Sequence, residues 1–412
     1  MKILFLAHRI PYPPNKGEKM RAFQELRFLA ARHSIDLVCF ADSAEEASQQ
    51  WNLRAFCRHI YVETRNPISA KVRMGVSLSR GRSLTNGYFY SLTLQKKVWH
   101  LLATEEYDVI FVYCSSMTQY IPSPSPAPVV TDFVDVDSAK WAQYARMSRF
   151  PLSWLYSREA RLLAEVEHKS ATESCVSIVT TEKEAELLNP DGRHRVEVVG
   201  NGVSPPPISI NAQLPADIVA LQPYLLFVGQ MDYRPNVDAV TYFADEIFPM
   251  IRKQKPHVQF LIVGRDPTRE VRRLARKPGI VVTGTVPDVH PYLAGTSVVV
   301  APFRIAQGVQ NKILEALALG KAVVSTPKPA EAIGARHAEV LLIADSARDF
   351  AQCVLSLLES AASQNRFDKA AEFVRQRFDW QKNLSRLESL LEQASKRGPA
   401  LAAGDPSRVE VN

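Results

Sequence analysis

Between Gln307 and Glu315 the sequence places a glycine, a lysine and a carboxylate at spacings that suit a nucleotide diphosphate. Lys312 and Glu315 stand three positions apart, so in a helix their side chains lie on one face. The free N–H groups at a helix start favour an anion, and the lysine adds a positive charge for a phosphate. The glutamate can accept two hydrogen bonds from ribose hydroxyls. This pattern predicts a diphosphate site that needs no metal; an ordinary, exposed i,i+3 ion pair is the alternative that spacing alone favours.

Two buried strands and one helix are expected to position these side chains. The β-branched run Ser297–Pro302 is typical of a buried parallel strand, and Ala322–Thr326 begins a second one. Between them, apolar residues recur at helical spacing over Val309–Leu319, so this segment is predicted to be an amphipathic helix. Gly308 precedes this helix and leaves its first N–H groups accessible to a ligand.

The segment Gln307–Gly320 resembles the donor-binding segment of GT-B glycosyltransferases of family 4. It is most similar to the sugar transferases associated with PEP-CTERM and exopolysaccharide systems, in which the phrase RIAxGxQNKxLEAxAxGKxVV is typical. The resemblance implies that Glu315 is the second of two acids eight positions apart and binds the donor ribose. Gln307 occupies the position of the first acid, and its amide can still hydrogen-bond a sugar hydroxyl.

The chain as a whole is predicted to be α/β, because apolar strand-like runs alternate with helical stretches. Its 412 residues exceed what one core usually supports. The resemblance implies two Rossmann-like, doubly wound domains facing across a cleft that holds the donor, which is the GT-B fold. The expected parts are an acceptor-side domain (1–203), a linker (204–223), a donor-binding domain (224–375), a helix packing back on the first domain (376–395) and a loose tail (396–412).

Further donor-binding residues are implied by the resemblance. Gly17 corresponds to a glycine loop after the first strand, and Gly229 ends the first strand of the second domain. The family places an arginine directly after that strand, where this chain has Gln230, so the diphosphate role passes to Arg234, the nearest cation. The turn that contacts the base is expected to contain the residues Val286 and Asp288.

Acidic residues follow a predicted strand of the first domain, in the phrase VVTDFVDVDS. Ligands of such sheets bind at the carboxyl ends of strands, which directs attention to His8, Ser115, Ser116 and the acids Asp132, Asp135 and Asp137. Asp135-Val136-Asp137 spells the D-x-D that binds a metal in another glycosyltransferase fold, but a chance match is the better interpretation because cations are available for the phosphates. We select Asp135 as the acid oriented toward the acceptor or the sugar; helix capping is the alternative.

Composition excludes several other classes of protein. Five scattered cysteines without metal-pair spacing indicate reduced thiols and a cytoplasmic location. No apolar run is long enough for a membrane span, and the apolar run before His8 is too short for a signal peptide. P-loop, dinucleotide, zinc-protease and serine-hydrolase motifs are absent from the sequence.

A basic stretch without acids lies between Thr64 and Thr104. Its cations are interleaved with apolar residues; the cations are Arg65, Lys71, Arg73, Arg80, Arg82, Lys96 and Lys97. This composition suits an anionic membrane surface, which would make the protein peripheral on the inner face of the plasma membrane, or an anionic acceptor. A solvated basic face is the alternative, and nucleic acid is disfavoured because no motif for it accompanies the charge.

The expected activity is transfer of a sugar from a nucleotide diphosphate to a hydroxyl acceptor, a hexosyltransferase-type reaction. Arg234, Lys312 and Asp135 are the expected catalytic residues, and no cofactor beyond the donor substrate is expected. Retention at the anomeric carbon and a glycan or lipid-linked acceptor are implied by the resemblance alone. Two alternatives stay open: an epimerase or phosphorylase on the same architecture, and a non-catalytic protein that binds sugar nucleotides or a membrane surface.

Overall fold

The computed structural model describes residues 1–14, 17–203, 214–306, 308–359 and 364–398, and in 364–368 the backbone alone. The chain forms two compact units. The first comprises Met1–Gly200 together with the chain from Gln381 onward, and the second comprises Asn201–Trp380.

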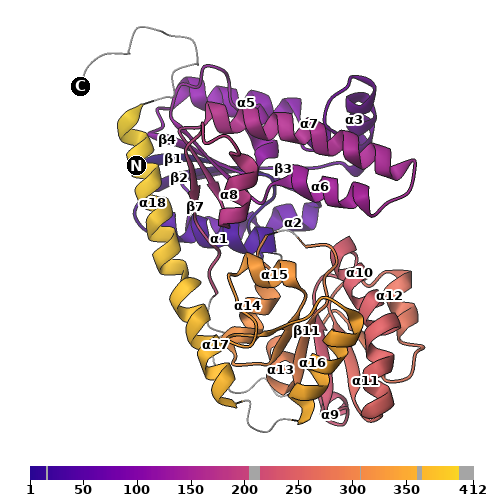
Figure 1. The fold of residues 1–412 in the computed structure, drawn as a ribbon. Coiled ribbons are helices and arrows are strands. Elements are labelled where there is room, and N and C mark those ends of the chain that lie inside the picture. Colours follow the sequence, from indigo (N-terminus) through magenta and orange to yellow (C-terminus); the bar gives the residue numbers. More distant parts are fainter. Residues whose placement is uncertain (15–16, 204–213, 307, 360–363, 399–412) are drawn as a thin grey trace. The chain divides into compact units, whose positions relative to one another are not determined.

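The first unit is built on a seven-stranded parallel sheet of order β3-β2-β1-β4-β5-β6-β7 (Figure 1). Residues 3–7 of β1 are completely buried, and such continuous apolar runs form parallel strands that are covered on both faces. The strands are β1 Lys2–Ala7, β2 Ser34–Ala41, β3 His59–Thr64, β4 Val109–Tyr113, β5 Val129–Val134, β6 Val176–Val179 and β7 Val196–Val198.

Helices cover both faces of this sheet. On one face, Leu94 and Val98 of α5 pack against Leu4 and Val38. On the other, α1 is attached to β4 because Tyr113 Oη donates a hydrogen bond to the Glu18 carbonyl at 2.7 Å. The helical elements are α1 Gly17–Ala30, α2 Ala44–Ser48, η1 Gln49–Leu53, α3 Pro67–Ser79, α4 Leu84–Tyr88, α5 Leu92–Thr104, η2 Ser115–Tyr120, α6 Asp137–Arg146, α7 Leu152–Glu173 and α8 Glu182–Leu188.

The second unit has a six-stranded parallel sheet of order β10-β9-β8-β11-β12-β13. Its strands are β8 Tyr224–Val228, β9 Gln259–Val263, β10 Ile280–Gly284, β11 Val298–Ala301, β12 Val323–Ser325 and β13 Leu342–Ile343. Its helical elements are α9 Ala216–Val219, α10 Arg234–Tyr242, the π-turn η3 Phe243–Ile247, α11 Phe248–Gln254, α12 Arg269–Leu274, α13 His290–Gly295, α14 Asn311–Ala318, α15 Pro327–Ala332, α16 Ala347–Glu359 and α17 Gln364–Arg377. Two doubly wound α/β domains are therefore confirmed.

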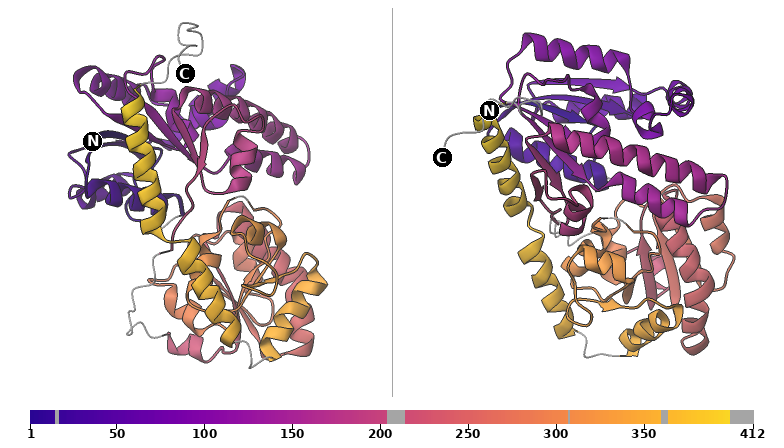
Figure 2. Two further views of the ribbon diagram at one scale, coloured as in Figure 1. Left: turned by 60° about the vertical axis from the view of Figure 1, so that its left-hand side comes forward. Right: turned by 45° about the horizontal axis from the view of Figure 1, so that its top comes forward.

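The last helix, α18 (Trp380–Arg397), belongs to the first unit from Gln381 onward. His33 Nε2 lies 3.0 Å from Glu388 Oε1, and Arg32 forms an ion pair with the same carboxylate. Arg386 Nη2 donates to Glu197 Oε2 at 2.7 Å, so α18 is also fastened to β7. Figure 2 shows α18 in yellow alongside the first unit.

The chain turns between its last two helices. Helix α17 ends at Arg377, and α18 begins at Trp380. The break is stabilised within the second unit, where Val203 N–H donates to the Phe378 carbonyl at 2.8 Å and the Phe378 ring is buried. The predicted linker contains α9, while 204–213 and the tail from 399 lie outside the described residues.

Candidate active site

Lys312 is the second residue of α14, and its ammonium group lies against the carboxyl end of β8. Lys312 Nζ donates a hydrogen bond to Asn236 Oδ1 at 2.7 Å. The same nitrogen lies 4.5 Å from the centre of the Phe227 ring and 5.0 Å from that of Phe303. The α14 start, the α10 start and the end of β8 are thereby brought to one place in the second unit.

The environment of this lysine differs from the exposed helix face that the sequence suggested. The residue as a whole is half-buried, but the two rings and Asn236 enclose its ammonium group. This burial lowers the pKa of Lys312 to about 7, and the nearby Glu315 carboxylate offsets only part of the effect. Burial disfavours the protonated form of Lys312, and an anion that reached the ammonium group would stabilise that form.

Glu315 lies one turn further along α14. Its carboxylate has no hydrogen bond or ion pair with any described residue, so the alternative of an ordinary Lys312–Glu315 ion pair is wrong. Burial raises the pKa of Glu315, and His290 and Lys312 act in the opposite direction. A half-buried carboxylate without a partner among these residues is available to accept hydrogen bonds from a ligand.

Gly229, directly after β8, gives Lys312 its space. A Cβ at this position would lie 2.7 Å from Lys312 Nζ and 2.8 Å from Asn236 Nδ2. Asn236 is buried, and its Nδ2 donates to the Gln230 carbonyl at 2.8 Å, which fixes the amide that receives the lysine. Sequence reasoning missed Asn236; its position in the first turn of the helix after β8 is the signal that could have found it.

Gly229→Ala should therefore weaken donor binding about tenfold, a change of about 1.4 kcal/mol, because the new methyl group displaces the ammonium and the Asn236 amide. Isothermal titration of UDP, GDP, ADP and dTDP against the purified variant measures this. Gly75→Ala is the matched control, since a Cβ there meets nothing within 4 Å. Equal affinities of Gly229→Ala and the unmodified protein would show that the ammonium position is irrelevant to the ligand.

The guanidinium group of Arg265 lies near Gln230. Arg265, which follows β9, places its Nη2 3.3 Å from Gln230 Oε1, and Met231 N–H donates to the Arg265 carbonyl at 2.8 Å. Arg234, the residue selected from the sequence, is the half-buried first residue of α10. The structure thus presents Arg265 beside the position where the family's arginine was expected, and the phosphate role of Arg234 stays a prediction.

The predicted base-contacting turn has a structural function at Asp288. Its Oδ1 accepts the His290 N–H at 2.9 Å and lies 2.6 Å from His290 Nδ1, where α13 begins. Although burial acts the other way, these hydrogen bonds hold the pKa of Asp288 below its usual value. Val286 packs against the core of the second unit. A contact of either residue with a base stays a prediction.

The structure describes two of the three loop residues that were expected to bind the donor, Gly308, Gly17 and Gln307. Gly308 is buried and adopts φ +62°, a left-handed conformation that favours glycine. Gly17 is the exposed first residue of α1 in the first unit. Gln307 lies outside the described residues.

In the first unit, Asp132 is a structural acid. Its Oδ2 accepts hydrogen bonds from Arg21 Nε and Nη2 at 2.8 and 2.6 Å, and both side chains are buried. Its Oδ1 accepts the Val134 N–H at 2.8 Å. Val134 has φ +65°, a rare conformation for a β-branched residue, and the pairing of β5 with β6 shifts at this point. The bulge sets the direction in which the chain leaves β5.

Asp135 follows this bulge. Its Oδ1 accepts a long hydrogen bond from Thr180 Oγ1 at 3.4 Å. Burial raises the pKa of Asp135 to about 6, against the influence of Lys140. The neighbouring Asp137 forms an ion pair with Lys140 at the start of α6. Of the three acids named from the sequence, Asp135 is therefore the one held least tightly by a cation.

His8, at the end of β1, stacks on Tyr113 with ring centres 5.8 Å apart. Burial and the adjacent Arg9 lower the pKa of His8 to about 4, so its imidazole is neutral at physiological pH. Ser115 and Ser116 are buried at the start of η2. A neutral histidine and a carboxyl group with a raised pKa thus both lie at the carboxyl edge of the first sheet.

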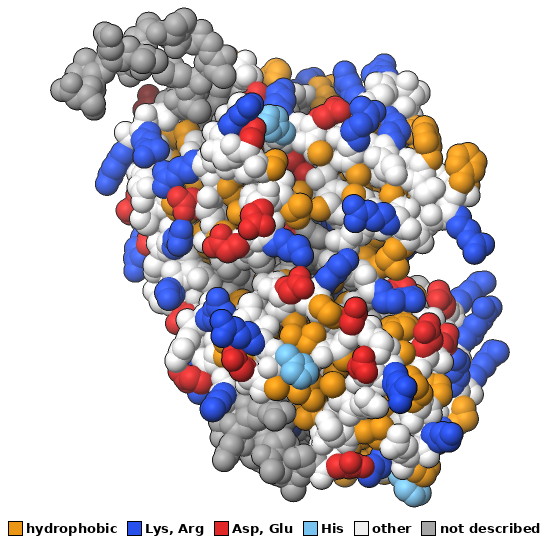
Figure 3. Space-filling model, viewed as in Figure 1, with side chains coloured by type: hydrophobic (Ala, Val, Ile, Leu, Met, Phe, Trp, Pro, Cys, Tyr) orange, Lys and Arg blue, Asp and Glu red, His pale blue; other side chains and the backbone are white. Residues whose placement is uncertain are grey.

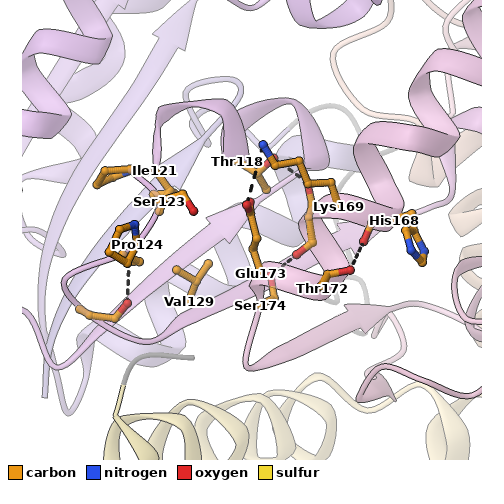
Figure 4. Close-up of a pocket in the computed structure, with 14 residues that line it drawn as sticks. Thr118, Ile121, Ser123, Pro124, Val129, His168, Lys169, Thr172, Glu173 and Ser174 are labelled. Atoms are coloured by element: carbon orange, nitrogen blue, oxygen red, sulfur yellow. Dashed lines mark hydrogen bonds and ion pairs between the residues drawn. The ribbon is translucent and has the colours of Figure 1, made fainter. Parts of the chain in front are cut away.

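The first unit also contains a cavity of about 380 Å³, shown in Figure 4. It lies at the amino end of β5, beside Val129, whereas Asp135 follows the carboxyl end of that strand. Its polar groups bond to one another: Thr118 Oγ1 lies 2.8 Å from Ser170 Oγ, and Lys169 forms an ion pair with Glu173 at 3.8 Å. These internal contacts leave little for a ligand to bind, so this cavity is not our candidate site.

Two Rossmann-like units, each built on a parallel sheet, have the architecture of the GT-B fold. Residues 222–360, which include Gly229, Asn236, Lys312 and Glu315, match the profile of the family described as glycosyl transferases group 1.

Particular proteins resemble the whole chain. A Klebsiella pneumoniae protein described as an uncharacterized 44.6 kDa protein in the cps region is 21% identical over 417 residues, covering 93% of this chain and 98% of that protein. Anabaena Alr3699/HepE, solved in complex with UDP, has a TM-score of 0.66 at 16% identity over 95% of this chain and 100% of its own. Sucrose-phosphate synthase from Thermosynechococcus elongatus has a TM-score of 0.68 at 16% identity over 96% of this chain and 100% of its own.

WaaG, a glycosyltransferase involved in lipopolysaccharide biosynthesis, has a TM-score of 0.61 at 16% identity over 96% of this chain and 99% of its own. At these identities the solved structures confirm the GT-B fold. Together with the family match they support a glycosyltransferase.

Proposed function

We propose that the protein transfers a sugar from a nucleoside diphosphate to a hydroxyl acceptor. The observation that carries this proposal is the Lys312 ammonium, held by Asn236 at the start of α14, with the Glu315 carboxylate one turn further on. A diphosphate beside Lys312 and a ribose beside Glu315 would satisfy both groups at once. A ligand of this class, UDP, is bound in the crystal structure of Alr3699/HepE, whose fold this chain shares.

In the proposed reaction the bond between the anomeric carbon and the diphosphate oxygen breaks, and the diphosphate leaves with the electron pair. The acceptor oxygen forms the new bond to the anomeric carbon and loses its proton to the departing diphosphate. Lys312, Arg234 and the N–H groups near Gly308 stabilise the charge that builds on the leaving group, usually the largest contribution in such transfers. Asp135, with its raised pKa, orients the acceptor or the sugar.

We further propose a retaining reaction of the hexosyltransferase type that needs no metal or cofactor, because the cationic side chains already neutralise the diphosphate. The acceptor is a glycan or a lipid-linked glycan in exopolysaccharide or cell-surface polysaccharide assembly. The relative from a cps region and the resemblance to PEP-CTERM-associated transferases support this assignment. We place the protein on the cytoplasmic side of the plasma membrane. Within the described residues, no helix is both long and apolar enough to cross a bilayer.

The test is turnover of a panel of UDP-, GDP-, ADP- and dTDP-sugars by the purified protein with lipid-linked glycans from a polysaccharide-producing cell. We expect one donor to give a glycosylated product, at the same rate in EDTA and in Mg²⁺ or Mn²⁺. NMR of the product should show the donor's anomeric configuration. Loss of turnover in EDTA would contradict the metal-free site, and product formed without any acceptor would indicate an epimerase.

A further inference from the structure

Large apolar side chains are exposed on two neighbouring parts of the first unit. On α3, Ile68, Val72 and Val76 are 75%, 61% and 42% exposed, and their spacing of four residues places them in one stripe. At the turn between α6 and α7, Phe150 is 82% and Trp154 57% exposed, and Met147 and Leu152 are exposed as well. Soluble monomers seldom expose such side chains together without a binding partner.

The two parts are joined by specific contacts. Arg158 of α7 donates from Nη2 to the carbonyls of Leu78 and Arg82, at 3.3 and 3.1 Å. Glu159 accepts hydrogen bonds from Ser83 Oγ and from the Leu84 N–H, at 2.7 and 2.8 Å. The end of α3 is therefore fixed to the second turn of α7. We term the stripe on α3 and the turn between α6 and α7 together the α3–α7 surface.

The charges of this surface all have one sign. Residues 65–104 and 138–158 contain no aspartate or glutamate. Its exposed cations are Lys71, Arg80, Arg82, Arg146 and Arg149. In the described part of the chain, none of the five forms an ion pair with a carboxylate. Figure 3 shows basic and apolar side chains intermixed near the free ends of α6 and α7.

We propose that the α3–α7 surface docks on an anionic lipid bilayer. Apolar side chains flanked by unpaired lysine and arginine are the composition of interfacial membrane-binding segments, in which the cations contact headgroups and the aromatic rings enter the interface. The sequence pointed to 64–104 alone; the aromatic turn between α6 and α7 is the part that the structure adds.

The same charges argue against other occupants. A second copy of the chain would bring the five cations against one another across a two-fold interface, which like-charge repulsion opposes. A polyanionic glycan would pair with the cations but would leave Phe150 and Trp154 in water. A bilayer with anionic headgroups satisfies both kinds of side chain.

The experiment is co-sedimentation of the full-length protein with vesicles of phosphatidylcholine, alone or mixed with phosphatidylglycerol, in the absence of donor. We expect binding to the mixed vesicles alone, weakened by high salt. Phe150→Ser/Trp154→Ser and Arg146→Glu/Arg149→Glu should each reduce binding about tenfold or more, as expected for the loss of anchors and of charge. Trp51→Ser, at another exposed tryptophan, and Arg27→Glu, at another exposed arginine, should bind as the unmodified protein does.

Circular dichroism checks that the variants are folded. We expect them to fold because substitutions at exposed positions usually change stability little. Equal binding to neutral vesicles, or undiminished binding of both double variants, would overturn the proposal. Binding to dextran sulfate as tight as binding to vesicles, and unchanged in Phe150→Ser/Trp154→Ser, would also overturn the proposal, because it would indicate a polyanion site. A concentration-dependent dimer abolished by the same variants would assign the surface to a second copy. Because donor is absent, none of these outcomes bears on sugar transfer.

Discussion

Lys312→Met should lower turnover of the nucleotide-sugar donor by a factor of about 10²–10³, the usual effect of removing one group that stabilises a developing anion. The methionine keeps apolar contact with Phe227 and Phe303 but cannot donate to Asn236 or neutralise a diphosphate. Because a buried charge is removed together with its desolvation cost, we expect little loss of stability. The measurements are steady-state turnover and thermal unfolding.

Lys328→Met is the matched control, because Lys328 is exposed in the same unit at the start of α15. It should retain full activity. If Lys312→Met retained full activity as well, the diphosphate would bind elsewhere in the protein. If it failed to fold, Lys312→Gln, which can still donate to Asn236, would separate folding from charge.

The lowered pKa of Lys312 adds a pH signature to this prediction. In the free protein the pKa is about 7, whereas a bound diphosphate would raise it. Above pH 7, donor binding should therefore take up a proton and should weaken as the pH rises. Calorimetry in buffers of different ionisation enthalpy measures the uptake, and Lys312→Met should abolish it.

The same shift sets the sign of a stability effect. Between about pH 7, the pKa of Lys312 in the folded protein, and pH 10.5, its ordinary pKa, the unfolded chain binds the lysine proton more tightly than the folded one. The contribution of Lys312 to stability therefore rises with pH across that window. A difference between the unfolding free energies of Lys312→Met and the unmodified protein that did not change from pH 7 to 10 would contradict the enclosed position of the ammonium.

Glu315→Gln should weaken binding of the nucleoside diphosphate about tenfold, because an amide is a poorer acceptor for two ribose hydroxyls than a carboxylate. The fold should be retained, since burial raises the pKa of Glu315 and a neutral side chain removes that cost. Titration of the ribonucleoside diphosphate and its 2′,3′-dideoxy analogue provides a specific measurement. The unmodified protein should prefer the ribose, and the variant should lose most of that preference.

Glu339→Gln, at an exposed position of the same unit, is the control and should leave the preference unchanged. A variant that lost affinity equally for both ligands would show that Glu315 acts on something other than the ribose. The comparison is a double-mutant cycle between side chain and hydroxyls, so it isolates that one interaction.

The sequence predicted the sheets well because parallel strands buried on both faces appear as continuous apolar runs. Runs such as those ending in Gly229 and in Pro302 mark β8 and β11. It missed β3, an edge strand whose residues are half-exposed or exposed, and β13, which has two residues.

For the candidate site, the family resemblance of Gln307–Gly320 selected Lys312 and Glu315, and their surroundings come from residues far away in the chain. Asn236 reaches Lys312 because β8 and β11 are neighbours in the sheet, and Arg265 reaches Gln230 because β8 and β9 are neighbours. One sequence does not reveal these adjacencies. Likewise, three acids in one short phrase have distinct environments only after folding: Asp132 binds Arg21, Asp137 binds Lys140, and Asp135 contacts Thr180.

The fastening of α18 has a practical consequence for dissecting the protein. Glu388 is held by Arg32 and His33, so the first unit is completed by residues that follow the second unit in the chain. Leu387 and Leu391 of α18 are buried against the first unit. A fragment that stops near Gly200 lacks α18 and would expose the apolar residues that these leucines cover. Separate expression of the two halves therefore requires the terminal helix to be supplied to the first one, in cis by circular permutation or as an added peptide.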